Sequence, residues 1–174
     1  MSLDTKMTGE ATASGTLDTL AGKYLTFKLD VEAFGIEILK VQEIIKMMSI
    51  THIPRTPSFV QGVINLRGKI IPVIDLRLKF DMESRDASEK TCIIVVTVQR
   101  GSRSVIMGVI VDEVSEVLDV AGDSIEPPPE FGSTVDTDFI MGMGKVNERV
   151  VTLLDLNKVL SEAEMAATES VVNQ

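Results

Sequence analysis

The chain has 174 residues, 44% of them hydrophobic, and 26 acidic against 17 basic residues give it a net charge of −9. Most of the excess acid lies in residues 1–22, 81–90 and 161–174, and the remainder shows no basic stripe of the kind that binds nucleic acids. No apolar run approaches the ~18 residues of a membrane span, and the single cysteine, Cys92, excludes an intrachain disulfide. We therefore expect a cytoplasmic globular protein without a secretory signal.

The first half of the chain predicts a tail followed by short strands. Residues 1–22 are rich in Thr, Gly, Ala and Ser without periodicity, which predicts disorder. A surface connection holds Pro54 and Pro57, and Asp75 is placed to cap a short helical turn that ends near Phe80. Alternating or continuous apolar residues predict strands at 24–29, 34–38, 62–66 and 69–74.

The second half repeats this plan after a linker at residues 81–90. Strands are predicted at 92–98, at 105–111 and on both sides of residues 145–149. The end differs from the first half, because apolar residues recur at helical spacing after Asp155. This spacing predicts a substantial helix capped by Asp155 and followed by a disordered tail at 167–174. The residues that carry the helical spacing are Leu156, Val159, Leu160 and Ala163.

The two halves are copies of one module. Residues 34–38 and 41–44 reappear 73 positions later, and residues 72–76 reappear 80 positions later. Short strands, two copies and one terminal helix predict an all-β fold built from a pair of small barrels. One charged turn differs between the copies, since Asn147 stands where the first copy has Arg67. Because the module folds without it, Arg67 is a candidate functional residue.

Catalytic and metal-binding patterns are weak in this chain. His52 has no Cys, Asp or Glu beside it at ligand spacing, and Cys92 opens an apolar strand as a small hydrophobic residue would. Asp112 and Glu113 are adjacent on a strand pattern, so their carboxylates point to opposite faces and not into one active site. We expect no enzyme, no metal and no cofactor. A nucleic-acid-binding barrel is the alternative from another class, and it needs a basic face with stacking aromatic residues.

Three segments resemble the CheW family of bacterial chemotaxis coupling proteins. These segments are residues 34–44, 62–76 and 111–114, and the resemblance extends over about residues 22–166. It implies two interleaved five-stranded SH3-like barrels in a CheW-like domain at residues 23–166. The two copies, at about 23–80 and 91–160, are expected to exchange strands between the barrels.

The resemblance also implies a function and partners. Family members are non-enzymatic adaptors that join the cytoplasmic helix hairpin of a methyl-accepting chemoreceptor to the regulatory domain of the histidine kinase CheA. Other CheW-like domains are further expected partners in arrays, and membrane association is expected to be indirect, through receptors. A chemosensory-like pathway with an output other than motility is an alternative.

The family's receptor-binding positions, in part a groove between the barrels, correspond to Ile38, Val41, Glu43, Arg67 and Cys92. Kinase or coupler contacts are expected at Gly62, Gly108, Phe131 and Gly142.

Each of these assignments has a structural alternative. Glu43 has Glu116 as its counterpart in the second copy, which also suits a shared structural role. Glu43 and Arg67 are able to bridge each other, which would make both partly structural. The hydrophobic receptor positions also suit an ordinary core, the glycines suit strained turns, and Phe131 suits the cap of a barrel.

Overall fold

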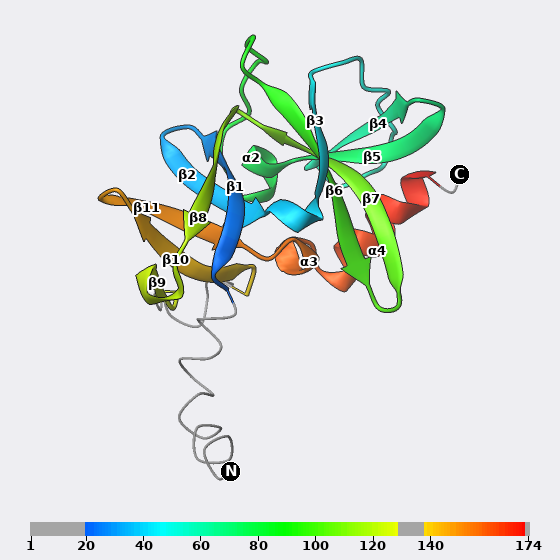
Figure 1. Cartoon of the computed structure of the whole chain (residues 1–174). Coiled ribbons are helices and arrows are strands. Elements are labelled where there is room, and N and C mark those ends of the chain that lie inside the picture. The colour runs from blue at the N-terminus through cyan, green and yellow to red at the C-terminus, as the bar shows by residue number, and fades with distance from the viewer. Residues whose placement is uncertain (1–19, 129–137, 173–174) are drawn as a thin grey trace.

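The structure is a computed structural model that describes residues 20–128 and 138–172. Two β-sheets lie side by side, and the C-terminal helix α4 packs against the second sheet (Figure 1). Most of the expected N-terminal tail, residues 1–19, lies outside the described part, but strand β1 already begins at Gly22. The expected disorder at 167–174 is wrong for residues 167–172, because α4 (Glu162–Val172) continues through them.

The first sheet contains six strands in the order β8, β1, β2, β11, β10 and β9. The sheet is antiparallel except where β11 lies parallel to β2. Its strands are β1 (Gly22–Leu29), β2 (Glu32–Glu37), β8 (Glu113–Val120), β9 (Ile125–Glu126), β10 (Ile140–Val146) and β11 (Arg149–Leu154). The two-residue β9 makes this barrel six-stranded where five strands were expected.

The second sheet contains five strands in the order β3, β6, β7, β5 and β4, again with one parallel pair, β5 and β7. Its strands are β3 (Val41–Lys46), β4 (Val60–Leu66), β5 (Lys69–Asp75), β6 (Cys92–Arg100) and β7 (Arg103–Val111). The chain after β3 returns to β4, where Thr51 and Val63 exchange two backbone hydrogen bonds of 2.9 Å. Ile125 and Glu126 of β9 pair with β10 in the same way in the first sheet.

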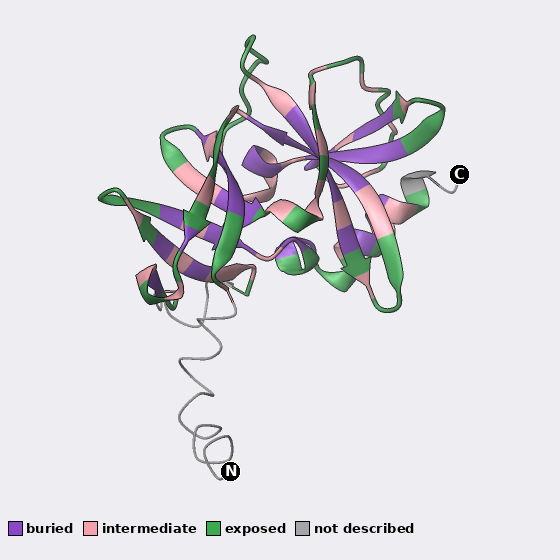
Figure 2. Cartoon of the chain, in the orientation of Figure 1, coloured by how far each residue is buried: buried purple, intermediate pink, exposed green. Residues whose placement is uncertain are grey.

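The expected interleaving of the two barrels is confirmed. The first sheet takes β1 and β2 from the first half of the chain and β8 to β11 from the second half, while the second sheet takes β3 to β5 and β6 to β7. Each half therefore contributes to both barrels, and neither half can bury its apolar faces without the other. Buried residues gather where the two sheets meet (Figure 2).

The short helices correct the prediction for the C-terminus. Asp75 caps α2 (Leu76–Lys79), as expected, and accepts a 2.9 Å hydrogen bond from the Arg77 N–H. Asp155 makes the same 2.9 Å bond to the Asn157 N–H, but its helix, α3, spans only Leu156–Val159. The expected long helix is interrupted before α4 begins. The helical spacing after Asp155 therefore runs across two separate helices.

The α4 helix has its own N-terminal cap. The Glu164 N–H donates to the Ser161 hydroxyl at 3.1 Å, and the Ser161 N–H donates back to the Glu164 carboxylate at 2.8 Å. This reciprocal capping box satisfies backbone donors that an uninterrupted helix would not expose. Its Ser-x-x-Glu spacing is readable in the sequence and would have indicated a new helix start.

Among the described residues, no helix is long and apolar enough to cross a membrane.

Candidate functional site

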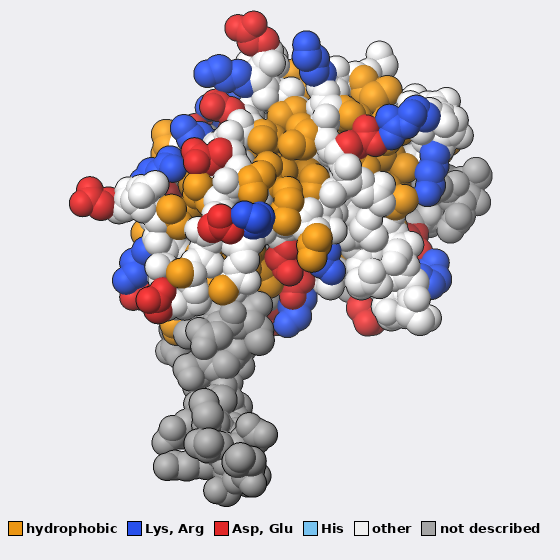
Figure 3. All heavy atoms as spheres, viewed as in Figure 1, with side chains coloured by type: hydrophobic (Ala, Val, Ile, Leu, Met, Phe, Trp, Pro, Cys, Tyr) orange, Lys and Arg blue, Asp and Glu red, His pale blue; other side chains and the backbone are white. Residues whose placement is uncertain are grey.

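An apolar strip lies on the surface where the two barrels meet. We call it the seam and define it by six side chains, four partly buried against the core and two, Ile44 and Val117, exposed by 45% and 47%. In Figure 3, hydrophobic side chains gather between β1 and β8 on one side and β3 on the other. The seam consists of Ile38, Val41, Ile44, Cys92, Val114 and Val117.

A β-bulge places the β3 residues of the seam on one face. Val41 lies opposite Val96 and Ile44 lies opposite Ile94, so three steps along β3 match two steps along β6. A regular strand would direct residues three apart to opposite faces, whereas a bulge returns them to the same face. Val96 and Ile94 both belong to the core between the barrels. Val41 and Ile44 therefore both face that junction.

The same bulge recurs in β8. Val117 lies opposite Leu25 and Val114 lies opposite Phe27, again three residues against two. Leu25 and Phe27 also belong to the core between the barrels. The repeated pattern Val-x-Glu-Ile/Val, 73 residues apart, thus supplies both walls of the seam. The bulges also explain why β3 and β8 were not among the predicted strands, since a bulge breaks the alternation that indicates a strand.

Cys92 lies at one end of the seam and connects its two walls. It lies opposite Lys46 at the end of β3, and its thiol is close to the N–H of Val114 at the start of β8. Burial raises the pKa of the Cys92 thiol, and the Val114 N–H only partly offsets this effect. The thiol therefore stays protonated at neutral pH and behaves as a small hydrophobic group.

Arg67 and Glu43, both predicted site residues, bind each other at the edge of the second barrel. Arg67 Nη1 donates to Glu43 Oε1 at 3.1 Å, and Nη2 donates to Oε2, which makes a bidentate ion pair. The hydrogen bond from Arg67 lowers the pKa of Glu43. The Arg67 side chain is still 69% exposed. It therefore has a structural partner and remains accessible to a second one.

The three predicted glycines lie in the interior of the barrels. All three are buried, and a Cβ at Gly62 would stand 2.0 Å from the Thr51 carbonyl oxygen. A Cβ at Gly108 would meet Ile93 at 2.7 Å, and one at Gly142 would meet Ile125 at 2.8 Å. Internal packing therefore accounts for these glycines, and their contact with a kinase or coupler stays a prediction. Phe131 lies outside the described residues.

A buried ion pair that the sequence did not indicate joins the two halves of the chain. Arg77 of α2 is 7% exposed, and its Nη2 lies 2.6 Å from Asp112 Oδ2, in the connection between β7 and β8. Asp112 also accepts from the Asp30 N–H at 2.6 Å and from Arg85 at 3.2 Å. Burial would raise the pKa of Asp112, but these donors outweigh it and the pKa lies below its usual range.

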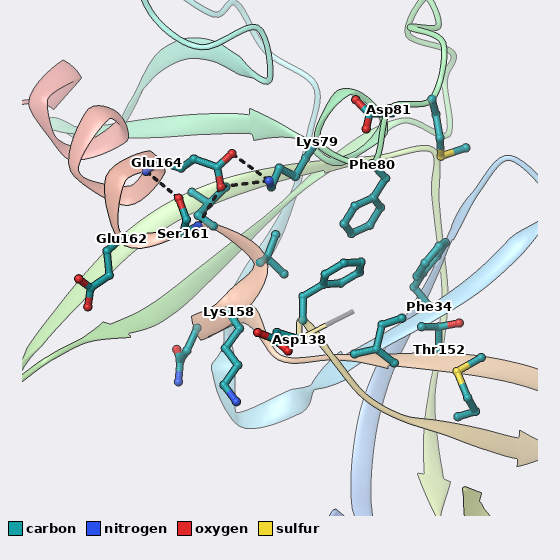
Figure 4. Close-up of a pocket in the computed structure, with 17 residues that line it drawn as sticks. Phe34, Lys79, Phe80, Asp81, Asp138, Thr152, Lys158, Ser161, Glu162 and Glu164 are labelled. Atoms are coloured by element: carbon teal, nitrogen blue, oxygen red, sulfur yellow. Dashed lines mark hydrogen bonds and ion pairs between the residues drawn. The ribbon is translucent and has the colours of Figure 1, made fainter. Parts of the chain in front are cut away.

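Besides the seam, the surface has a hollow of about 1020 Å³ between the end of α2, the start of α4 and strands β2, β10 and β11 (Figure 4). Phe34, Phe80 and Phe139 stack along its wall with ring centroids 5.9 and 5.1 Å apart. Lys79 Nζ lies 3.0 and 2.9 Å from the two oxygens of Glu164, so this cation is already paired. The hollow thus offers aromatic surface and a neutralised pair.

The carboxylates considered for catalysis have separate partners. Asp112 faces Arg77, whereas Glu113 lies 3.8 Å from Lys90. Within residues 20–128 and 138–172, no cluster of three or more His, Cys, Asp or Glu side chains has the arrangement that holds a metal ion. These features suit binding and not catalysis: an apolar strip, with Glu43 on the strand that forms one of its walls paired to Arg67 at the turn between β4 and β5.

Comparison with known proteins agrees with this fold. A family model of the CheW-like domain matches residues 23–164. The chain belongs to the CheW-like family. Chemotaxis protein CheW of Klebsiella aerogenes is 43% identical over 95% of this chain and 98% of its own length. A probable chemotaxis protein CheW of Rhizobium etli is 34% identical over 82% of this chain and 90% of its own length.

Solved structures and more distant relatives give the same result. The crystal structure of the scaffolding protein TtCheW from Thermoanaerobacter tengcongensis has a TM-score of 0.72 and 39% sequence identity, over 83% of this chain and 96% of that one. Protein FrzA of Myxococcus xanthus is 28% identical over 83% of the chain. The expected CheW-like fold and its place among chemotaxis scaffold proteins are therefore confirmed.

Proposed function

We propose that this chain is a cytoplasmic, non-enzymatic adaptor that couples the helix hairpin of a chemoreceptor to the regulatory domain of the histidine kinase CheA. Membership of the CheW-like family, whose members carry chemotaxis and scaffolding names, supports the role in signalling. Other CheW-like domains are further partners in this proposal, and contact with the membrane is indirect, through the receptor. The CheA and receptor partners rest on the family resemblance and on the chemistry of the seam.

The seam is the observation that carries the receptor part of this proposal. Soluble proteins seldom expose contiguous apolar side chains without a partner, and an amphipathic helix covers an elongated apolar strip with its own apolar stripe. Ile44 and Val117 are each nearly half exposed on opposite walls. The other four seam residues, Ile38, Val41, Cys92 and Val114, are partly buried and pack against the core. A receptor helix that lies along the seam would cover both walls at once.

Arg67 extends the proposed receptor site beyond the apolar strip. Its guanidinium has five donors, and Glu43 uses two of its nitrogens, so further donors remain for a carboxylate or a backbone carbonyl of the partner. We place the kinase and other couplers on a different surface, for which Phe131 and the three glycines stay the predicted residues. A coupling protein must bind two partners at once, and separate surfaces permit this.

Substitutions on the two walls test the receptor site. We expect Ile44→Lys and Val117→Lys each to weaken binding of a receptor cytoplasmic fragment at least about tenfold, because each places a charge in an interface that buries apolar surface. The same variants should bind the kinase regulatory domain normally and should melt as the parent does. Val150→Lys is the matched control, since Val150 is 54% exposed on β11 and is not part of the seam.

Titration calorimetry with each partner separates the outcomes. Loss of receptor binding in both wall variants, with normal binding in Val150→Lys, supports the seam as the receptor site. Equal loss in all three variants would mean that added charge acts non-specifically, and no loss in either wall variant would contradict the assignment. Failure of the unmodified chain to bind any kinase or receptor fragment would contradict the adaptor function itself.

A further inference from the structure

The two walls of the seam are related by the internal repeat. Val41 and Ile44 of β3 correspond to Val114 and Val117 of β8, and the same bulge sets both pairs. The walls run antiparallel. At one end, Cys92 connects the end of β3 to the start of β8. At the other end, Ile38 lines a small hollow together with Lys23, and Lys23 pairs with Asp119 at the end of β8.

This quasi-twofold arrangement leaves an ambiguity for any helix that docks on the seam. A helix reversed by the twofold rotation exchanges one wall for the other and meets nearly the same apolar side chains. Ile38 and Cys92 do not remove the ambiguity, because each adds one apolar residue at its own end. Apolar contact therefore holds a helix on the seam without determining which way it points, since hydrophobic burial is non-directional.

Charged residues break the symmetry of the seam. Lys40 of the first copy corresponds to Glu113 of the second, and Lys46 corresponds to Asp119, so the sign of the charge is reversed at two equivalent positions. Both copies carry a glutamate at the bulge. Arg67 neutralises Glu43, whereas Asn147 stands at the turn of the second copy that is equivalent to the turn of Arg67. The β3 wall is thus basic where the β8 wall is acidic.

Ion pairs with neighbouring lysines reduce the charge difference between the β3 wall and the β8 wall but do not remove it. Lys23 lies 3.0 Å from Asp119, and Lys90 lies 3.8 Å from Glu113. With these partners included, the β8 wall has three acids against two bases, a net charge of −1. The β3 wall has three bases, counting Arg67, against the single acid Glu43, a net charge of +2. Glu37, which lines the same hollow as Lys23 and Ile38, adds a further acid outside the β3 wall.

We propose that this charge difference fixes the direction in which the receptor helix docks, with an acidic flank of the helix along β3 and a basic flank along β8. The reversed orientation would place acid against acid and base against base. Charge complementarity of this kind sets register and orientation more than affinity. This inference rests on the proposed receptor function, and it assigns Lys40, Lys46, Glu113 and Asp119 a part in it.

Two helical peptides test the direction directly. Both carry the same apolar stripe. When each peptide is viewed from its N-terminus toward its C-terminus with the stripe facing down, the first has glutamates on its left flank and lysines on its right. The second has these flanks exchanged. A nitroxide label at the peptide N-terminus broadens nearby amide signals of the protein. We expect the first peptide to broaden signals at one end of the seam, near Cys92 or near Ile38, and the second to broaden the opposite end. The preference should be on the order of tenfold.

A charge exchange in the protein supplies the matched control. The variant Lys40→Glu, Lys46→Asp, Glu113→Lys and Asp119→Lys gives each wall the residues of its counterpart. We expect each peptide to reverse its direction on this variant while its affinity stays within about threefold, because the reversed peptide again places its acidic flank along the basic wall and its basic flank along the acidic wall. High salt should reduce the preference, since charges at the surface are screened.

The outcomes distinguish this inference from the function on which it rests. Peptides that bind the seam but point both ways equally, or that keep their direction on the exchanged variant, overturn the directional role of the charges and leave the receptor site intact. Peptides and receptor fragments that do not bind the seam at all overturn both.

Discussion

Arg67 and Asn147 have the same left-handed backbone conformation, with φ of 51° in each, at equivalent turns of the two halves. Both turns join two strands of a hairpin, β4 to β5 and β10 to β11. The residue that follows each of them also has positive φ, 87° at Gly68 and 65° at Glu148. Such two-residue turns match the twist of the strands and favour Asn followed by Gly. Each half of the chain has one of these two preferred residues.

We expect Arg67→Asn to fold normally and to lose function. Asn suits the left-handed turn at least as well as Arg, and the lost ion pair with Glu43 is exposed to solvent, so the melting temperature should change little. Receptor-stimulated kinase activity should fall roughly tenfold, the loss typical of an interface arginine.

The double variant with Glu43→Gln is the control for Arg67→Asn. If Arg67 serves mainly to hold Glu43, Arg67→Asn should unfold at a lower urea concentration than the parent, and adding Glu43→Gln should restore part of the stability. That result would make Arg67 a structural residue. Urea unfolding of both single variants and the double variant, beside the kinase assay, decides between the two roles.

Glu148→Gly should stabilise the protein. A left-handed conformation costs a residue with a Cβ about 1 to 2 kcal/mol, whereas the extra freedom of glycine in the unfolded chain costs about 0.4 to 1 kcal/mol. The difference predicts a gain of about 0.5 kcal/mol in the free energy of unfolding. Gly68→Ala, at φ 87° with open space around it, is the reciprocal control and should destabilise. Equal effects of the same sign would contradict the explanation by backbone strain.

The Arg77–Asp112 pair should dominate acid sensitivity. The folded state lowers the pKa of Asp112, so its contribution is complete above the unfolded value of about 3.9 and is lost as the pH falls toward the lower folded value. Asp112→Asn leaves the buried Arg77 poorly neutralised and should cost about 3 kcal/mol at pH 7. Its stability should then vary less than that of the parent between about pH 5 and pH 3.

Asp75 also makes the stability depend on pH, in the direction opposite to Asp112. Burial raises its pKa in the folded state, so protonation of Asp75 on acidification favours folding and opposes the loss at Asp112. The comparison between the parent and Asp112→Asn cancels the larger cause, the burial of Asp75, because both proteins retain it. The Asp112 charge is a smaller cause that also raises the pKa of Asp75, so its removal reduces the opposing effect in the variant. Parallel stability curves for the two proteins, measured by urea unfolding, would contradict the assignment to Asp112.

The helix caps should have similar energetic roles. Asp75 and Asp155 make equal 2.9 Å bonds at the starts of two four-residue helices, so Asp75→Ala and Asp155→Ala should each cost about 1 kcal/mol. Ser161→Ala, at the cap of the longer α4, should cost a similar amount. A much larger loss for Asp155→Ala than for Asp75→Ala would instead support the predicted single long helix after Asp155. Unfolding in urea measures all three.

Local patterns in the sequence determined much of this protein. Alternation of branched aliphatic residues indicated most strands, the repeat at 73 and 80 residues indicated two equivalent halves, and Asp75 indicated its short helix. These features depend on neighbours within a few residues, or on direct comparison of the copies. The resemblance to the CheW family placed Ile38, Val41, Glu43, Arg67 and Cys92 among the candidate residues.

The tertiary structure decided how these pieces meet. The sequence does not say that the bulges in β3 and β8 bring Val41 and Ile44 to face the same junction as Val114 and Val117. Nor does it pair Arg77 with Asp112, and it left open whether Glu43 and Arg67 contact a partner or each other. The seam and the Arg77–Asp112 pair join residues of different halves, and they form because each half contributes strands to both barrels. The Glu43–Arg67 pair instead forms within the first half, between β3 and the turn after β4. The physical reason is that neither half can bury its apolar faces alone, so the strand exchange determines which side chains become neighbours.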